Sequence, residues 1–375
     1  MLQNKIYQNY SLEIFKLFIT ILLSLAVIAW TVRAVNFLDL IVENGYSILT
    51  YFEYSFLNLF GIIPKFIPLS FLLAITIFII KQTQENELVI LWTSGIKKIE
   101  IVNLFLIVSI LITTIHLIFS AIVTPFALNK SRYLLTNNNL TSILPTFRIQ
   151  QFSDSFQDLT FMIDDKFENK ISNIFLHDES NVLKSISSKK NDKSSSTIIA
   201  KIGVVKKKKL ILFDGMIISA DKENNNDIVK FEQIDIDLSE IQNTTIKAPK
   251  IQETSTVKLI GCANNNFYND KNCRGNFKKE ILPTLNRRII FPFFIPVIAL
   301  ISSLLLIKNK SSIFFNKISI FSYSFMILLY AELTIRYTGI FKLYAGIFIL
   351  SPFILAALAY LFLKFKLSRE SKFHA

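Results

Sequence analysis

The chain has 375 residues, of which 51% are hydrophobic, with 35 Phe and only 9 Gly, and a formal net charge of +13. This composition suits a bilayer-embedded chain better than a water-soluble domain of ordinary composition. The positive charge does not require a nucleic-acid partner, because basic cytoplasmic loops can contact anionic lipid. No basic-aromatic module for binding nucleic acid is visible in the sequence.

Six apolar stretches approach or reach the roughly 20 residues that a helix needs to cross a bilayer. Three precede and three follow a polar middle segment. The predicted spans are Leu17–Val32, Tyr54–Ile80, Ile101–Leu128, Ile289–Ile307, Ile318–Ala331 and Leu343–Phe362. The first resembles a secretory signal, but its apolar run is longer than usual and no cleavage site follows, so we interpret it as a retained anchor.

The chain therefore divides into residues 1–128 with three spans, residues 129–284 as an inserted domain, and residues 285–375 with three further spans and a short tail. Lys residues are concentrated in the loops after the second and fourth spans and at both ends. By the positive-inside rule, both termini are cytoplasmic and the inserted domain lies outside.

A short polar segment, QENELVILWTSG at residues 84–95, separates the second and third spans. Thr83 is suited to cap a helix whose first turn is acidic, and Gly95 to end it before two Lys residues. The pattern predicts a cytoplasmic docking helix, and a helix lying flat on the membrane interface is equally compatible. The residues assigned to docking are Glu85, Glu87, Leu88, Leu91, Trp92 and Gly95.

The inserted domain contains short alternating runs such as LTFMID, TIIAKIGVV and IVKFEQIDIDL, which predict half-buried strands. We expect an antiparallel sandwich or jelly roll. Cys262 and Cys273 flank ten residues close to the return to the membrane. In an oxidising compartment they could form a structural disulfide; free thiols remain an alternative, and a metal pair lacks other ligands nearby.

Several kinds of chemistry have no support in the sequence. No glycine lies in a phosphate-binding loop, so the chain is not expected to hydrolyse ATP. His116, His177 and His374 are isolated, and His116 in the third span is best explained as a group satisfied by a neighbouring helix. We predict no catalytic residue, metal site or cofactor in this chain.

The segment IIPKFIPLSFLLAITIFIIKQTQENELVILWTSGI resembles the second span and following helix of the lipopolysaccharide-export permeases LptF and LptG. VRAVNFLDLIVENG resembles the region after the first span and is closer to the F type than to the G type. LILFDGMIIS resembles the outer β-domain and LNRRIIFPFFIPVIALISSLLL the start of the fourth span, in the same order as in these proteins. The resemblance implies a membrane α-helical fold with six transmembrane helices, arranged 3+3, and an inserted all-β periplasmic domain like a jellyroll. Trp92, Thr93 and the cysteine pair depart from the family pattern.

The resemblance implies the permease subunit of an ABC transporter that extracts lipopolysaccharide from the bacterial inner membrane. The implied partners are a second, LptG-like permease, a cytoplasmic LptB-like ATPase dimer carrying ATP and Mg, a single-span LptC-like jellyroll protein and a periplasmic LptA-like bridge protein. Glu87 aligns with the acid that contacts the ATPase. The Phe, Leu and Ile residues of the first, second and fifth spans would line a cavity for the acyl chains.

Cations near the outer ends of the spans are candidates for binding phosphate. They are Arg33, Lys130, Arg132, Arg336 and Lys342. An anchor at the membrane interface is the more common role of such cations, and Arg33 is the strongest candidate among them for a substrate contact. Glu332 and Arg336 are spaced for a helix ion pair, which better explains Arg336. Lys65 lies between Pro64 and Pro68, where a proline break in the helix would let it reach water.

Two other functions compete with transport. A non-transporting inner-membrane scaffold presenting a periplasmic β-domain would share the same architecture but would bind no lipid. A membrane transferase would need converging His or carboxylate groups, which the sequence does not show. A macrolide-type export permease usually has four spans, so the six predicted here disfavour it.

Overall fold

A computed structural model describes most of the chain. The described residues are 2–42, 46–137, 149–156, 159–179, 195–206, 209–220, 226–237, 250–263, 277–307, 317–340 and 342–373. Within them, six helical segments are long and apolar enough to cross a membrane, which confirms the predicted number of spans. These segments are Lys5–Val42, Ile48–Gln84, Lys98–Leu135, Lys279–Leu306, Lys317–Tyr337 and Ala345–Ser368.

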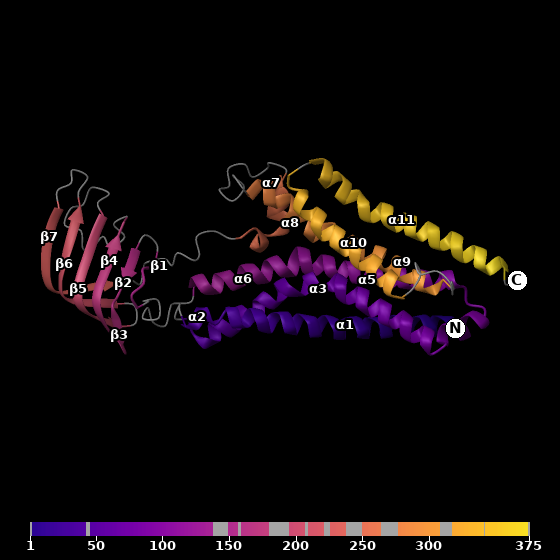
Figure 1. Cartoon of the computed structure of the whole chain (residues 1–375), viewed down its shortest axis with the longest axis horizontal. Coiled ribbons are helices and arrows are strands. Elements are labelled where there is room, and N and C mark those ends of the chain that lie inside the picture. Colours follow the sequence, from indigo (N-terminus) through magenta and orange to yellow (C-terminus); the bar gives the residue numbers. More distant parts are fainter. Residues whose placement is uncertain are drawn as a thin grey trace. The chain divides into compact units, whose positions relative to one another are not determined.

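The helices before the inserted domain are α1 (Leu2–Asn36), α2 (Asp39–Val42), α3 (Ile48–Gln84), α4 (Glu87–Thr93), α5 (Lys98–Ile118), the π-helical turn η1 (Phe119–Val123) and α6 (Thr124–Asn137). Those after it are η4 (Ile251–Glu253), α7 (Thr256–Ala263), α8 (Phe277–Ile289), η6 (Phe291–Phe293), α9 (Phe294–Ser302), η7 (Ser303–Leu306), α10 (Lys317–Tyr337) and α11 (Lys342–Phe373). Helix α1 begins and α11 ends at the same end of the helical bundle (Figure 1).

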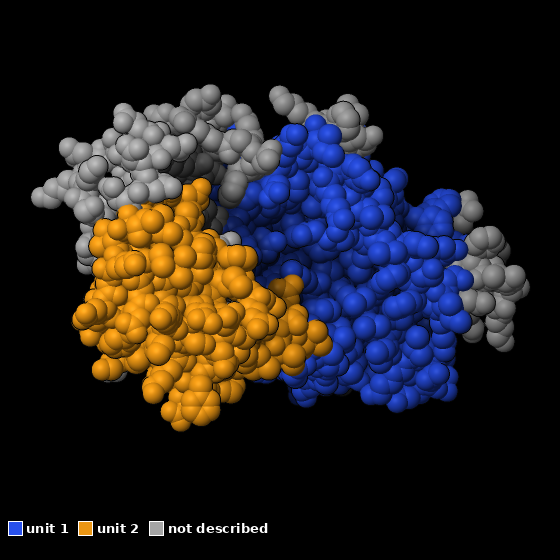
Figure 2. All heavy atoms as spheres, turned by 60° about the vertical axis from the view of Figure 1, so that its left-hand side comes forward, with its two compact units in different colours: residues 1–31, 57–130, 250–375 blue, residues 32–56, 131–249 orange. Residues whose placement is uncertain are grey.

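The chain forms two compact units, coloured separately in Figure 2. The first comprises residues 1–31, 57–130 and 250–375, and the second residues 32–56 and 131–249. The first unit thus includes residues 250–284, which the sequence division assigned to the inserted domain. The reason is a local apolar cluster, in which Ile251 and Leu259 pack with Ile281 and Leu285 of α8.

The helical unit is organised around α9, whose side chains are almost all buried. Phe294 and Ile298 have no exposed surface, and α9 contacts α5, α10 and α11. Phe71 and Phe78 of α3 and Phe105 of α5 continue this core. The apolar sequence of α9 therefore reflects burial within protein on all sides, whereas α1, α10 and α11 retain many exposed apolar side chains suited to lipid.

The described residues of the second unit form seven antiparallel strands, as the alternating runs predicted. They are β1 (Ser153–Phe156), β2 (Leu159–Met162), β3 (Asp165–Phe167), β4 (Lys170–Asp178), β5 (Ser195–Lys206), β6 (Lys209–Ala220) and β7 (Asn226–Asp237). The order β1-β2-β4-β5-β6-β7 is a meander, with β3 paired to β4. The described strands form one curved sheet (Figure 1) and not the two packed sheets of a sandwich.

One face of this sheet carries the apolar core of the unit. Phe161, Ile174, Ile198 and Leu212 come from four neighbouring strands and are all buried. Their alternation with exposed or half-exposed residues fixes the register, because a slip of one residue would turn the whole apolar set to the other face.

Prolines in the helical unit leave backbone carbonyls without an intrahelical donor, because proline has no N–H for the carbonyl four residues earlier. Pro64 removes the bond to the Phe60 carbonyl in α3, and the Thr124 hydroxyl donates to that oxygen at 2.7 Å. Helix α3 continues through Pro64 and Pro68, so the predicted break at Lys65 is wrong.

The same compensation occurs at two other prolines. The Thr256 hydroxyl donates at 2.5 Å to the Ala121 carbonyl, four residues before Pro125. The Ser120 hydroxyl donates at 2.8 Å to the Arg288 carbonyl, four residues before Pro292. These bonds join segments distant in sequence and satisfy the backbone where lipid offers no partner.

We expect Thr124→Val to destabilise the helical unit, because it removes the donor to the Phe60 carbonyl with almost no change in shape. Interhelical hydrogen bonds in membranes contribute about 0.6 to 1.7 kcal/mol, so the midpoint of thermal unfolding in detergent should fall by a few degrees. Thr114→Val is the matched control, since among the described residues the Thr114 hydroxyl bonds only to the Leu111 carbonyl of its own helix. Equal shifts of the unfolding midpoint for both variants would contradict a stabilising role for the Thr124–Phe60 hydrogen bond.

A second prediction concerns Gly215 in β6, which lies directly opposite Phe231 of β7. A Cβ atom there would overlap the Phe231 ring and approach the Ile199 carbonyl oxygen to 2.6 Å. We expect Gly215→Ala to destabilise the sheet by about 1–3 kcal/mol. Limited proteolysis of the full chain should then cleave residues 131–249 roughly fivefold faster or more. Gly346→Ala, where no described neighbour lies within 4 Å of the new Cβ, should not change the rate.

Candidate functional site

Helix α4 begins later than the sequence predicted. Thr83 does not cap it, because α3 runs to Gln84 and the Thr83 hydroxyl bonds the Ile79 carbonyl within that helix. The turn between the helices is made by Asn86, whose φ of 58° places it in the left-handed region that Asn tolerates better than most residues. Glu87 is then the first residue of α4.

The predicted end of α4 at Gly95 agrees with the structure. Gly95 has a φ of 94°, and its N–H donates to the Trp92 carbonyl. The N–H of Ile96 reaches back to the Leu91 carbonyl at 3.1 Å, which completes a Schellman motif. A left-handed residue is required here, so glycine is the favoured one.

The two faces of α4 have different roles. Leu88 and Leu91 are buried in the main core of the helical unit, so these two predicted docking residues hold α4 in place and offer almost no contact surface. Trp92 packs against the same core, and the Lys98 ammonium lies 4.7 Å from the centre of its ring. The outward face presents the exposed side chains of Glu87, Val89 and Ile90.

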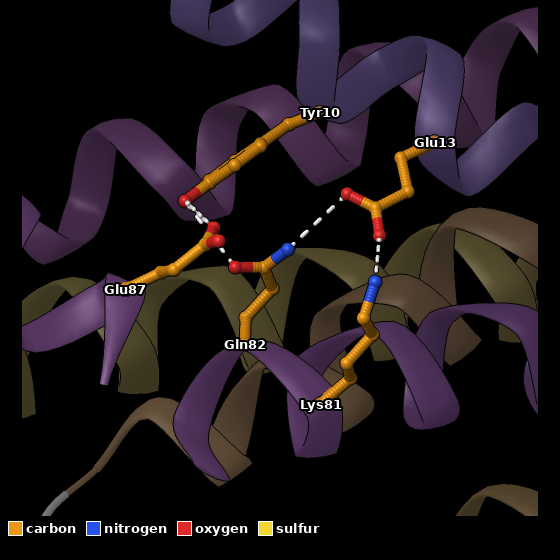
Figure 3. A network of polar contacts seen from close by, with 5 residues as sticks. All are labelled: Tyr10, Glu13, Lys81, Gln82 and Glu87. Atoms are coloured by element: carbon orange, nitrogen blue, oxygen red, sulfur yellow. Dashed lines mark hydrogen bonds and ion pairs between the residues drawn. The ribbon is translucent and has the colours of Figure 1, made fainter. Parts of the chain in front are cut away.

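A network of polar side chains joins α4 to α1 and α3 (Figure 3). The Tyr10 hydroxyl lies 3.3 Å from Glu87 Oε2 and 3.5 Å from Gln82 Oε1. Gln82 Nε2 donates to Glu13 Oε2 at 3.2 Å, and Lys81 Nζ forms an ion pair with Glu13 Oε1 at 2.8 Å. Glu87 is thus bound at the start of α4, whereas Glu85 is exposed in the turn before it.

A cavity of about 560 Å³ lies in the same unit, between α3, α6, α8 and α10. It contains a concentrated positive charge: Lys65, Arg287, Arg288 and Arg336 line it together with one carboxylate, Glu332. The wall is otherwise largely apolar. Its apolar lining includes Leu69, Leu128, Phe291, Phe325, Leu328 and Leu329.

Arg288 is a buried part of this lining, with 5% of its surface exposed. Its guanidinium donates to the Thr254 carbonyl at 2.9 Å, the Gln252 carbonyl at 2.9 Å and the Thr256 hydroxyl at 3.0 Å. The positive charge is therefore satisfied by neutral oxygen atoms, which leaves the net charge in place at the cavity wall.

The other two arginines differ from each other. Arg287 forms an ion pair with Glu332, so the predicted pairing of Glu332 with Arg336 is replaced by one between α8 and α10. Arg336 is exposed and has no ion pair among the described residues. It is thus the cavity cation whose charge is most available to a ligand.

His116 also lines the cavity, and 2% of its surface is exposed. Its ring meets Phe291 edge to face at 6.2 Å, but its Nδ1 atom has no hydrogen-bond partner among the described residues. The expectation that a neighbouring helix satisfies this group is therefore wrong for Nδ1.

Among the predicted phosphate-binding cations whose side chains the structure describes, only Arg336 lines this cavity. Lys130 is exposed on α6 but does not line it. Arg33 and Arg132 belong to the second unit. Lys342 begins α11, and its side chain lies outside the described residues.

The remaining predicted pair involves the two cysteines. Cys262 is buried in α7, and Cys273 lies outside the described residues, so their pairing stays a prediction. Among the residues that the structure describes, no cluster of three or more His, Cys, Asp or Glu side chains could hold a metal.

The sequence prediction missed Arg287 and Arg288, although a signal was present. Two consecutive arginines directly before the Pro-containing start of the fourth span, LNRRIIFPFF, exceed what a single anchoring cation requires. The arrangement can hold a molecule that combines acidic groups with apolar chains, since cations and apolar side chains share one wall.

Comparison with known proteins identifies the family. The family model for lipopolysaccharide export system permease LptF/LptG matches residues 12–365, almost the whole chain. A search of curated proteins found no match. The match does not separate the F type from the G type, so the closer likeness to F stays a prediction. The six spans, the inserted antiparallel sheet and this match together show that the chain belongs to the LptF/LptG family of lipopolysaccharide export permeases, multi-pass proteins of the inner membrane.

Proposed function

We propose that this chain is a permease subunit of an ABC transporter, which extracts lipopolysaccharide from the inner membrane and passes it to a periplasmic bridge. The observation that carries the proposal is the cavity, where Lys65, Arg287, Arg288 and Arg336 share a lining that is otherwise largely apolar. Lipopolysaccharide combines phosphates with acyl chains, and family membership makes it the expected lipid.

The energetics of extraction explain why both kinds of side chain are needed. Moving one 14-carbon acyl chain from lipid to water would cost about 10 kcal/mol at roughly 0.8 kcal/mol per CH₂. An apolar surface must therefore receive each chain as it leaves the bilayer. The cations would bind the phosphates at the same time, with Arg336 able to form bidentate hydrogen bonds.

The energy source would be a separate LptB-like ATPase dimer, because this chain has no phosphate-binding loop. Helix α4 supports the docking role through the exposed Glu87, Val89 and Ile90 on its outward face. Helix α3 contains both Lys65, at the cavity, and Gln82, in the polar network that includes Glu87 of α4. The intervening part of α3 is roughly 25 Å long, at about 1.5 Å per residue, so one continuous helix would connect the two sites.

The other proposed partners follow the same architecture. A second, LptG-like permease would complete the transport path, and an LptC-like protein would join the complex. The sheet ends in β1 and β7, each paired on one side only among the described strands. Such edges can pair with strands of a jellyroll partner, including an LptA-like bridge protein. We place both termini in the cytoplasm and the sheet in the periplasm.

Arg336→Glu should reduce the amount of lipid A that co-purifies with the full chain in mild detergent, because it reverses the most available charge in the cavity. We expect a loss of roughly tenfold, measured by mass spectrometry of the lipid fraction and corresponding to about 1.4 kcal/mol. Lys130→Glu makes the same charge change on an exposed residue of the same unit, outside the cavity. It should retain the lipid.

Absence of lipid A from the wild-type chain would count against transport and favour the scaffold. Equal amounts of lipid A retained by Arg336→Glu and Lys130→Glu would show that the cavity is not the lipid-binding site.

Glu87→Arg should abolish recovery of the ATPase with the tagged chain, because a cation would replace the carboxylate at the start of the outward face. Membrane insertion should be unchanged, as Glu87 is exposed. Glu232→Arg, an exposed position on β7, controls for the change in net charge. Normal ATPase recovery with Glu87→Arg would exclude α4 as the docking site.

A further inference from the structure

Tyr10 is placed to control the carboxylate of Glu87. The hydroxyl of this buried tyrosine lies 3.3 Å from Glu87 Oε2, although the two residues come from α1 and α4 (Figure 3). Glu87 is exposed and would otherwise be free to adopt several rotamers in solvent. Its contact with Tyr10 selects the rotamers that turn the carboxylate toward α1.

The position of the Tyr10 hydroxyl is set by the core. The Tyr10 ring meets Phe78 of α3 edge to face, with centroids 5.3 Å apart, and Phe78 meets Phe105 of α5 in the same way at 6.0 Å. Three spans therefore fix the ring. The hydroxyl is a rigid donor, and the flexible partner in the bond is Glu87.

Gln82 gives the same hydroxyl a second acceptor. Gln82 is 1% exposed, and its Oε1 atom lies 3.5 Å from the Tyr10 hydroxyl. Its Nε2 atom donates to Glu13, which is also paired with Lys81. The amide is thus oriented with its oxygen toward Tyr10, and a tyrosine with one proton faces two acceptors.

We infer that Tyr10, a residue of the first span, is a positioning residue for Glu87 and holds the docking carboxylate of α4 in place. The inference rests on the proposed function of α4 as the ATPase docking helix. The charged acceptor is favoured while α4 is unoccupied. When a cation of the ATPase engages Glu87, the Tyr10 proton can turn to Gln82, so no buried donor is left unpaired. Helix α1 thereby contacts the docking element directly.

Tyr10→Phe tests this inference, because it keeps the ring on Phe78 and removes only the hydroxyl. The probe is the ATPase that co-purifies with the wild-type chain from native membranes, and the readout is its affinity for the purified full chain. We expect binding to weaken about fivefold, the effect of losing one hydrogen bond of ordinary net strength, because Glu87 is exposed to solvent. Amide exchange should rise at residues 88–96.

Tyr7→Phe is the matched control on the same helix. The Tyr7 hydroxyl donates to Glu100 Oε2 of α5 at 2.9 Å, so it joins α1 to a carboxylate outside α4. Its loss should leave ATPase affinity unchanged and raise exchange near residue 100 instead.

A double-mutant cycle with Glu87→Ala, which leaves no acceptor for the Tyr10 hydroxyl at this position, separates positioning from general packing. Tyr10→Phe should have almost no further effect once the Glu87 carboxylate is gone, whereas Tyr7→Phe should behave independently. Additive losses for Tyr10→Phe and Glu87→Ala, or unchanged exchange in α4, would overturn the inference while the docking role of α4 stands. Full ATPase affinity in Glu87→Ala and Glu87→Arg alike would instead overturn the docking proposal.

Discussion

The fold of the helical unit depends on satisfying backbone carbonyls in a medium that offers no hydrogen bonds. Proline at residues 64, 125 and 292 removes an N–H from the ladder, and a hydroxyl from another segment supplies the missing donor each time. Thr256, which donates to the Ala121 carbonyl, also accepts a hydrogen bond from Arg288, so this compensating bond is linked to a residue of the cavity wall. The prolines thus determine which segments must lie together, and the cavity forms where those segments meet.

The two candidate sites use charge in different ways. At the cavity, the Arg288 charge is held by neutral oxygen atoms and is not cancelled, so it adds to the field that an anionic lipid would meet. At α4, the acids are restrained by a tyrosine, an amide and one lysine at the opposite end of α3. The first arrangement is suited to attracting an anionic ligand. The second is suited to a change of hydrogen-bond partners when another protein binds α4.

The spans and strands could be predicted from the sequence because length and apolar period are properties of the segments themselves. Which face of α4 is exposed could not be predicted. The spacing of Leu88 and Leu91 indicates an apolar face, but it does not show whether that face is covered by the same chain or by a partner. Thr83 looked like a cap only because the pattern does not show that Glu85 still bonds the Lys81 carbonyl. Arg287 and Arg288 were missed because cations beside a span are commonly anchors.

Helix α4 has only seven residues, too few to be stable as an isolated helix in water. Its shape depends on Leu88 and Leu91 being packed in the core and on the left-handed turn at Gly95. The helix therefore exists only when the spans around it have assembled. A permease with misplaced spans would present no ordered surface at this position, so attachment of an energy source would be restricted to chains that have already folded.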